Sequence, residues 1–493
     1  MEIKPINKTI MKKKWTTLFV LVTLITSSLQ AKVTLPAVLS DNMVFQQKTD
    51  VKIWGWSKPG ATINVKATWG IKGSAKADHE GNWSVIIKTP EASFTEYKIT
   101  ISDGEPITIN NVLIGEVWLC SGQSNMEMTL MGIGPSGVTG ASQFLAESKG
   151  YAGLRLFHVP QKSSITPEKD CQGRWLPSSP EALKDFSALG YLYGLQLHRL
   201  LNVPVGIINA SWGGTIIEAW MDADAQKAFT DVDLNQLYNE ELQVYNKPVS
   251  LYNGMIAPLT NFSLRGFIWY QGESNVPRYS TYADKMVALI KFWRKLWRND
   301  NMPFFYAEIA PYDYRANRMD MSEAQIDAAL LREQQAKVMD MIDNTGMVCT
   351  NDLVYPYERS EIHPANKPEV ARRFAYWALH NTYNYGDVIP VIGPRFKAMK
   401  INNGKAIISF TVSEPGGFIA ATGEIQGFEI AGSDRVFYPA KAVKQSPFSR
   451  EISVFSENVE EPVAVRYCFR NWLPGNVSSV FGLPLVPFRT DSW

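Results

Sequence analysis

The sequence contains little cysteine. Of its 493 residues only four are cysteine, namely Cys120, Cys171, Cys349 and Cys468, and they lack the C-x-x-C spacing of zinc and redox motifs. No group of His, Cys and Asp has the spacing of metal ligands either, so we expect an activity that uses no metal and no other cofactor. Four cysteines leave room for a disulfide bond in an oxidising compartment, but the sequence assigns no pair.

Net charge and long apolar runs are also scarce. Lys and Arg number 49 against 48 Asp and Glu, and the formal net charge of +1 gives no reason to expect nucleic acid or an anionic membrane as a partner. Beyond the N-terminal segment no run is long and apolar enough to span a bilayer, so stable membrane insertion is not expected. A chain of 493 residues exceeds one compact core, and we expect two or three domains.

The N-terminus has the pattern of a signal peptide. Lysines at 12–14 precede the apolar stretch 15–25, and small residues lead on to Ala31. The alternative is a membrane anchor, but the apolar stretch is too short to span a bilayer stably. We therefore expect a signal peptide over residues 1–31 and a mature protein, starting near Lys32, that is secreted or periplasmic.

The remaining chain changes its pattern twice. Residues 32–110 contain β-branched and aromatic segments separated by turn signals, which predicts an N-terminal β-sandwich domain. In 111–389 short apolar segments alternate with helical patterns, which predicts a parallel sheet with helices on both faces and a ligand site at the carboxyl ends of its strands. Residues 390–493 are again rich in strand patterns. The expected strands are 51–56, 62–66, 83–87, 97–101, 112–120, 205–209, 267–270, 303–309, 347–350, 406–412, 451–455 and 463–467, and the expected helices are 187–201, 282–297, 322–341 and 368–382.

Ser124 is the leading candidate for a catalytic nucleophile. It lies in the Gly-Gln-Ser-Asn loop 122–125, directly after an apolar strand pattern. Such a loop can present the hydroxyl at the sheet edge beside backbone N–H groups that stabilise an oxyanion. The alternative is a capping serine, and the G-x-S-x-G elbow of α/β-hydrolases is absent from this loop. The loop alone does not decide between the two roles.

His363 is the leading candidate for the base. It lies in the polar loop 360–364 ahead of a helical pattern, and a neutral imidazole is the usual proton acceptor for a serine. Glu361, two residues earlier, can orient the ring or stabilise its charged form. A capping role beside Pro364 is the alternative. The other histidines lie in a turn, after a strand pattern or in helical patterns, at His79, His158, His198 and His380.

Six short segments of the chain form a recognisable set. They are GEVWLCSGQSNM at 115–126, SWGGTIIEAW at 211–220, WYQGESN at 269–275, LREQQ at 331–335, EIHPANK at 361–367 and GLPLVPFRT at 482–490. Together they resemble the sialate O-acetylesterase family within the SGNH hydrolases, and the resemblance runs from about Leu35 to the C-terminus. It implies an α/β fold of the SGNH-hydrolase (flavodoxin-like) type, a three-layer parallel sheet flanked by the N-terminal β-sandwich and the C-terminal β-rich region.

The resemblance also implies roles for individual residues. Ser124 would attack the acetyl carbonyl, and His363 would accept its proton. The backbone N–H groups of Ser124 and Gly213 would bind the oxyanion. The side chain of Gln271 would replace the Asn that SGNH enzymes use for the same purpose, with Asn275 in reserve. The expected substrate-binding residues are Gln123, Asn125, Glu273 and Asn275.

One position departs from the family pattern. SGNH enzymes often place Asp three residues before the histidine, and Ser360 stands there in this chain. Glu361 is the substitute that we expect beside His363, with Asp352 and Glu273 as further candidates. If no carboxylate serves, the enzyme would work as a Ser–His dyad.

Three functions are compatible with these residues. The first is a serine esterase that removes O-acetyl groups from sialic acid or from another acetylated glycan such as xylan. The second is a non-catalytic glycan-binding protein on the same scaffold, which the presence of both Ser124 and His363 argues against. The third is a glycosidase, whose paired carboxylates would need a separation of about 5 Å in a retaining enzyme. We expect the first, with an acetylated carbohydrate as its partner; the sequence is silent on the oligomeric state.

Overall fold

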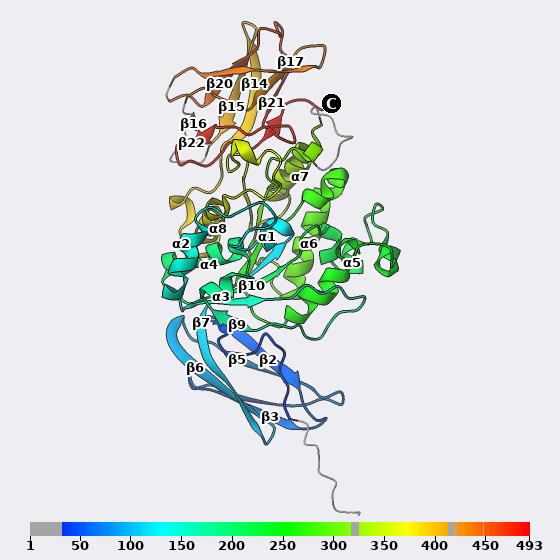
Figure 1. Cartoon of the computed structure of the whole chain (residues 1–493), viewed down its shortest axis with the longest axis vertical. Helices are drawn as coiled ribbons and strands as arrows, with labels where there is room; N and C mark the ends of the chain where they lie inside the picture. The colour runs from blue at the N-terminus through cyan, green and yellow to red at the C-terminus, as the bar shows by residue number, and fades with distance from the viewer. Residues whose placement is uncertain (1–31, 317–324, 413–418, 421–422, 447) are drawn as a thin grey trace, which may run out of the picture.

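The structure consists of three units that follow one another along its long axis. The computed structural model describes residues 32–316, 325–412, 419–420, 423–446 and 448–493. An N-terminal β unit, a central unit of strands and helices, and a C-terminal β unit are stacked from bottom to top in Figure 1. The signal-peptide prediction for 1–31 lies outside the described residues.

The N-terminal unit contains two groups of paired strands around one hydrophobic core. β2 pairs with β5, while β3 pairs with β4 and β6, and β6 pairs with the first part of β7. In β3 the residues Ile63, Val65 and Ala67 are buried and their neighbours are exposed, because successive side chains on a strand point to opposite faces. The expected strands of this region are confirmed. The strands are β1 (Val44–Gln46), β2 (Asp50–Trp56), β3 (Thr62–Ala67), β4 (Lys72–Lys76), β5 (Asn82–Lys88), β6 (Ser93–Ser102) and β7 (Pro106–Gly122).

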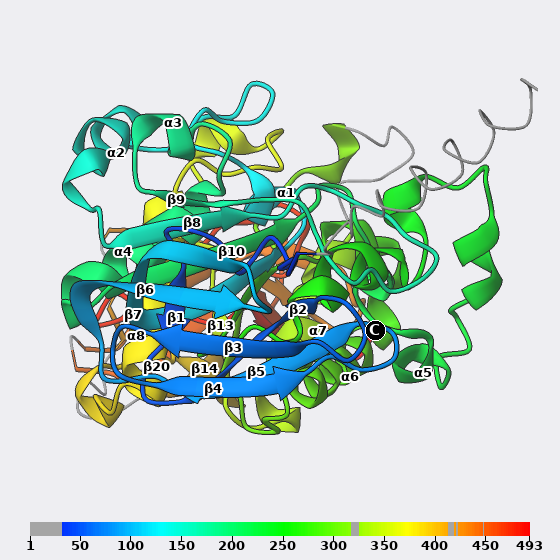
Figure 2. The same ribbon diagram turned by 90° about the horizontal axis from the view of Figure 1, so that it is seen from below.

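Strand β7 belongs to two units at once. Its first part pairs antiparallel with β6, up to Ile114, and its second part, from Glu116 to Gly122, pairs in parallel with β10. Figure 2, seen from below, shows the N-terminal strands in front of the central unit. The boundary expected between residues 110 and 111 falls inside this continuous strand, so the first two units share a backbone element and not a linker.

The central sheet is mixed and has the order β13-β12-β11-β7-β10-β8-β9. The pairs from β13 to β8 are parallel, and β9 is antiparallel to β8. The strands expected between 205 and 350 are confirmed as β10 to β13, although most of their ends differ by a residue or two. The bounds are β8 (Leu154–His158), β9 (Trp175–Pro177), β10 (Val205–Ser211), β11 (Gly266–Tyr270), β12 (Phe304–Ala307) and β13 (Thr345–Val348).

Alternate residues of β7 pack into two different hydrophobic clusters. Trp118 and Cys120 share a cluster with residues of α4 and α8, whereas Val117 and Leu119 share a cluster with residues of α6 and α7. Because these residues alternate along a strand, the two clusters lie on opposite faces of the sheet. The helix expected at 322–341 begins at Asp327, and 322–324 lie outside the described residues. The helices are α1 (Ser124–Glu127), α2 (Ala141–Glu147), α3 (Pro180–Leu183), α4 (Ala188–Leu201), α5 (Ala223–Gln226), α6 (Tyr282–Leu296), α7 (Asp327–Met341) and α8 (Lys367–Thr382).

The carboxyl ends of β7, β10 and β11 lie side by side. Gly122, the last residue of β7, is in register with Ser211 of β10 on one side and with Tyr270 of β11 on the other. Gly122 has a φ of 138°, and a Cβ at this position would approach the Tyr270 carbonyl oxygen to 2.1 Å, so only glycine fits. The loops that follow these strands therefore start at one edge of the sheet, as the sequence predicts.

The C-terminal unit is built from antiparallel strands. Two four-stranded sheets, in the orders β14-β15-β20-β19 and β18-β17-β21-β23, contribute to one hydrophobic cluster that includes Ile408, Ile430, Val454 and Val465. The strands expected in this region are confirmed. The bounds are β14 (Arg395–Asn402), β15 (Lys405–Thr411), β16 (Ile419–Ala420), β17 (Phe428–Ala431), β18 (Phe437–Pro439), β19 (Lys441–Lys444), β20 (Glu451–Phe455), β21 (Ala464–Tyr467), β22 (Ser478–Ser479) and β23 (Phe488–Arg489).

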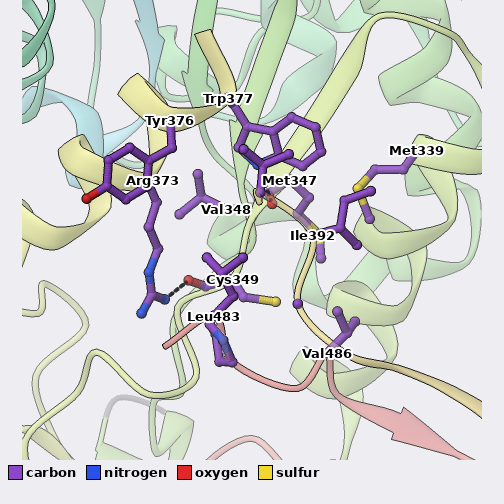
Figure 3. Close-up of a pocket in the computed structure, with 13 residues that line it drawn as sticks. Met339, Met347, Val348, Cys349, Arg373, Tyr376, Trp377, Ile392, Leu483 and Val486 are labelled. Atoms are coloured by element: carbon purple, nitrogen blue, oxygen red, sulfur yellow. Dashed lines mark hydrogen bonds between the residues drawn. The ribbon is translucent and has the colours of Figure 1, made fainter. Parts of the chain in front are cut away.

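A small cavity of about 20 Å³ lies where the C-terminal segment meets α7 and α8. Figure 3 shows Met339, Trp377 and Val486 around it, and Arg373 donates a hydrogen bond of 2.8 Å to the Cys349 carbonyl oxygen. None of its lining residues is an expected site residue, and a volume of this size holds about one water molecule.

The four cysteines are all buried and form no disulfide bond in the structure.

Within the described ranges, none of the helices combines the length and apolar character needed to cross a membrane.

Candidate active site

Ser124 is the first residue of α1 and is separated from the end of β7 by Gln123 alone. The carbonyl oxygen of the preceding Gln123 accepts hydrogen bonds from the N–H groups of Met126 and Glu127, both at 2.9 Å. Ser124 is itself 9% exposed, and its N–H belongs to the first turn, where the helix supplies no acceptor. The serine is therefore presented at the sheet edge beside a backbone donor.

Gly213 lies directly against the serine. A Cβ built on Gly213 would be 3.2 Å from Ser124 Cβ, so the close approach depends on glycine. The Gly213 N–H, expected to bind an oxyanion, donates a 2.5 Å hydrogen bond to Glu127 Oε2, and Gln161 donates to the other oxygen of the same carboxylate. Burial raises the pKa of Glu127, although these two hydrogen bonds oppose the shift. A carboxylate oxygen thus occupies the place where an oxyanion would bind.

The variant Glu127→Gln should therefore accelerate the reaction. A neutral amide oxygen accepts a weaker hydrogen bond than a carboxylate, so the substrate displaces it more easily and kcat/KM should rise about fivefold, or ~1 kcal/mol. The measurement is p-nitrophenyl acetate hydrolysis, with Glu91→Gln as a control because that carboxylate is 74% exposed in the N-terminal unit. A fall in kcat/KM would show instead that the carboxylate holds Gly213 in its working position.

His363 lies in the loop between β13 and α8. Its Nε2 is buried, and among the described residues neither ring nitrogen has a hydrogen-bond partner or an ion pair. Burial, and after it the positive charge of Lys367, lowers the pKa of His363 to about 4. The ring is therefore neutral at physiological pH and able to accept a proton.

Asn125 connects the serine loop with the histidine loop. Its Nδ2 donates to the Ile362 carbonyl oxygen at 3.1 Å and to Glu273 Oε1 at 2.6 Å. Its Oδ1 accepts a 2.9 Å hydrogen bond from Lys367 Nζ. Asn125 is 0% exposed, and all of these contacts are with the loops around it. The residues next to Ser124 and His363 are thereby held together, and the predicted substrate-binding role of Asn125 stays a prediction.

Lys367 and Glu273 are a buried pair of opposite charges on either side of Asn125. Burial lowers the pKa of Lys367 to about 7, although the carboxylates of Glu273 and Glu358 oppose the shift. Burial also raises the pKa of Glu273, whose Oε2 has no hydrogen-bond partner within the described part of the chain. Lys367 Nζ donates a second hydrogen bond, of 2.5 Å, to the Pro364 carbonyl oxygen. The lysine therefore fixes the residue that follows His363.

The side-chain amide of Gln271 forms all of its hydrogen bonds with other residues of the protein. Its Nε2 donates to the Thr215 carbonyl oxygen at 3.0 Å and to Asn275 Oδ1 at 2.7 Å, and its Oε1 accepts from Tyr282 at 2.8 Å. An amide has two N–H donors, so none is left for an oxyanion in this structure. Asn275, the reserve candidate, donates to Glu218 Oε2 at 3.0 Å and is also fully buried. Their roles toward an oxyanion or a substrate stay predictions.

Gln123 connects the loop after β7 with the loop after β11. Its Oε1 accepts from the N–H groups of Gly272 at 3.0 Å and Ser274 at 3.3 Å, and its Nε2 lies 3.4 Å from Ser274 Oγ. These contacts fix the loop that precedes Ser124.

No carboxylate among the described residues reaches the imidazole of His363. Glu361 Oε2 accepts a 3.0 Å hydrogen bond from Ser136, and Asp352 forms hydrogen bonds of 2.8 and 2.6 Å with Arg373. Glu273 binds Asn125. The structure therefore does not bring Glu361 or the two further candidates into contact with His363, and the role of Glu361 as its acid partner stays a prediction.

Two residues of this arrangement were given no part in the serine mechanism by reasoning from the sequence, although Glu127 is one of the carboxylates that the glycosidase alternative would use. Glu127 stands three residues after Ser124, one helical turn away, which is the signal that it shares a face with the nucleophile. Lys367 closes the segment that contains His363, but its burial depends on contacts that span 242 residues. In the described ranges no group of three or more His, Cys, Asp or Glu side chains is placed to hold a metal ion.

Comparisons with known proteins show the family of this chain. A family model described as "Carbohydrate esterase, sialic acid-specific acetylesterase" matches residues 114–378. Human sialate O-acetylesterase is 30% identical over 377 residues, which cover 68% of each chain, and the mouse protein of that name is 26% identical over 498 residues, or 88% of each. The crystal structure of a carbohydrate acetylesterase from Xanthomonas citri has a TM-score of 0.82 and 34% identity, covering 94% of this chain and all of the other. The chain therefore belongs to the sialic acid-specific acetylesterase family of carbohydrate esterases and is a carboxylic ester hydrolase.

Proposed function

We propose that this protein removes O-acetyl groups from sialic acid, with Ser124 as the nucleophile and His363 as the general base. The observation that carries this proposal is the position of Asn125, which binds the His363 loop while its neighbour Ser124 lies beside Gly213. The curated relatives named sialate O-acetylesterase support the substrate.

The reaction proceeds through an acetyl-enzyme. Ser124 Oγ attacks the acetyl carbonyl carbon while His363 accepts its proton. The bond from that carbon to the sugar oxygen then breaks, and His363 returns the proton to the leaving oxygen. A water molecule next attacks the acetyl-serine, with His363 again accepting and returning a proton, and acetate and free Ser124 result. His363 must be neutral to accept a proton at each attack. Its lowered pKa favours the neutral form of the ring.

The negative oxygen formed at each attack is stabilised by backbone donors. The Ser124 N–H is one, and the Gly213 N–H becomes the other when the Glu127 carboxylate moves aside. His363 and Ser124 work as a dyad in this proposal, since the three candidate carboxylates bind other groups.

The sheet and its helices support a finer assignment of the central unit as an SGNH-type, flavodoxin-like three-layer fold. Residues 1–31 support export as a signal peptide, so the enzyme would act in the periplasm or outside the cell.

A panel of acetylated sugars tests the function. Acetate release is measured from O-acetylated sialic acid, acetylated xylan oligomers and acetylated mannan oligomers, at several concentrations of each. We expect kcat/KM to be at least about tenfold higher for sialic acid, because polar groups built for one substrate are left unpaired by another. The Ser124→Ala variant is the control for acetate that leaves without the enzyme. A higher kcat/KM with xylan or mannan would reject sialic acid as the preferred substrate.

A further inference from the structure

A cavity of about 520 Å³ is lined in part by the loops that follow β10 and β11. Gly214, which lines it, follows Gly213, and Ser274, which also lines it, contacts Gln123 next to Ser124. Part of the remaining wall comes from the chain after α5, the lobe at the right-hand edge of Figure 1. The cavity therefore lies between the loops next to Ser124 and this lobe, where the body of a substrate would fit.

The carboxylates around this cavity are already bound by other side chains. Glu218 accepts hydrogen bonds from Lys285 at 2.9 Å and from Asn275 at 3.0 Å. Asp231 also pairs with Lys285, and Asp233 accepts from Asn235 and Gln236 at 3.0 Å. Lys285 offsets part of the negative charge of Glu218 and Asp231, whereas the amide donors on Asp233 hold its carboxylate without neutralising it. The remaining lone pairs of these carboxylates suit sugar hydroxyls.

Arg278 is a cationic residue in the wall of this cavity, and its N–H groups donate no hydrogen bond to the described residues. It lies within the 3₁₀ segment Glu273–Thr281, at a point where φ is −128° and ψ is 38°, so the chain kinks there. Its side chain is 40% exposed, and its contact with Glu218 is an ion pair at 3.6 Å, longer than a hydrogen bond. Within the described part of the chain the guanidinium donates no hydrogen bond, although it carries five N–H donors.

Asn246 adds an unused acceptor to the same wall. Its Oδ1 is buried and has no partner among the described residues. A buried carbonyl oxygen without a hydrogen bond costs free energy, which a ligand hydroxyl would recover. The wall of the cavity thus contains an arginine fork and a buried acceptor that has no partner among the described residues.

We infer that Arg278 binds the carboxylate of an acidic sugar whose acetyl group lies at Ser124. The inference rests on the proposed function and adds the residue that would distinguish sialic acid from neutral acetylated glycans. A guanidinium group can donate two parallel hydrogen bonds to one carboxylate. Partial burial of the site strengthens this interaction. Neutral oligomers of xylose or mannose have no carboxylate, so Arg278 gives them no advantage.

Two forms of one substrate test the inference. O-acetylated sialic acid is compared with the same sugar whose carboxylate has been converted to a carboxamide, and acetate release is measured for both. With the unsubstituted enzyme we expect kcat/KM to be about tenfold to a hundredfold lower for the amide, the usual effect of losing a charged hydrogen bond. In Arg278→Gln, kcat/KM for the acid should fall by the same factor, mainly through KM, while the value for the amide stays within about twofold.

The controls separate binding from folding. Arg278→Lys should recover part of the loss, because it restores the charge without the fork. Lys227→Gln removes an exposed cation near α5, outside the cavity lining, and should leave both substrates unchanged. p-Nitrophenyl acetate should be hydrolysed equally by Arg278→Gln and the unsubstituted enzyme.

Each contrary result overturns a different statement. Equal losses for acid and amide in Arg278→Gln would overturn the carboxylate contact, and so would an unsubstituted enzyme that treats acid and amide alike. An enzyme that hydrolyses p-nitrophenyl acetate but neither sialic acid form would overturn the proposed function and this role with it.

Discussion

Ser124→Ala should lower kcat for acetate release by at least about a thousandfold, with KM and the thermal unfolding temperature close to those of the unsubstituted enzyme. The loss is large because no other atom can form the acetyl-enzyme, and the residual rate comes from binding and oxyanion stabilisation alone. The fold should be spared because, among the described residues, the Ser124 hydroxyl makes no hydrogen bond. A serine-directed organophosphonate should label the unsubstituted enzyme at Ser124 and leave the variant unlabelled.

Ser178→Ala is the matched control for this experiment. Ser178 is also buried, but its hydroxyl donates a 2.9 Å hydrogen bond to the Ser148 carbonyl oxygen. Its removal should cost about 1 kcal/mol of unfolding free energy and leave kcat unchanged. The opposite pattern, with near-normal turnover in Ser124→Ala, would remove Ser124 from the mechanism.

The positions of the strands could be predicted, because a strand shows in the residue pattern of its own segment. The strands with which each one pairs could not be predicted, because pairing depends on distant segments. Val112 to Cys120 reads as a strand from its apolar residues alone. That the same strand begins at Pro106 and pairs first with β6 and then with β10 depends on contacts far along the chain. A domain boundary placed by a change of pattern therefore falls inside a continuous strand.

The same distinction applies to the candidate site. Ser124 and Gly213 could be located because each loop follows a strand pattern, and parallel strands bring such loops to one edge. The direction of a side chain was not available from the sequence. Gln271 has the amide that an oxyanion needs, but Tyr282 on α6 and Thr215 bind it inside the protein. Glu127 faces Gly213, 86 residues away, for the same non-local reason.

The expected acid partner of His363 illustrates what spacing along the chain leaves undetermined. Glu361 is two residues from the histidine, yet its carboxylate accepts from Ser136, which is 225 residues away. The segment around His363 is a series of bends and not a strand, so a spacing of two residues does not determine whether the two side chains face each other. We therefore expect Glu361→Gln to stay within about tenfold of the unsubstituted kcat, or roughly 1.4 kcal/mol of barrier.

Replacement of His363 should lower kcat as much as replacement of Ser124 does. His363→Gln keeps a polar side chain of similar size but no basic nitrogen, so kcat should fall by at least about a thousandfold at every pH. The unsubstituted enzyme should keep its kcat/KM down to unusually acidic conditions. The reaction needs the neutral imidazole, and because the pKa is lowered to about 4, activity is present above that pH and is lost as the pH falls through it.

Lys367→Met tests the origin of this acidic limit. Burial is the larger cause of the low pKa and the Lys367 charge the second, so removing the charge should move the acid limb of kcat/KM upward while burial still holds it below the ordinary value of 6.5. The lysine also donates hydrogen bonds to Asn125 and to Pro364, so kcat on the plateau should fall too as the two loops separate. The pH profile distinguishes these effects, because a looser loop lowers the plateau without moving the limb. An acid limb near pH 6.5 in the unsubstituted enzyme would show that water reaches the imidazole during turnover and that its burial does not set the limit.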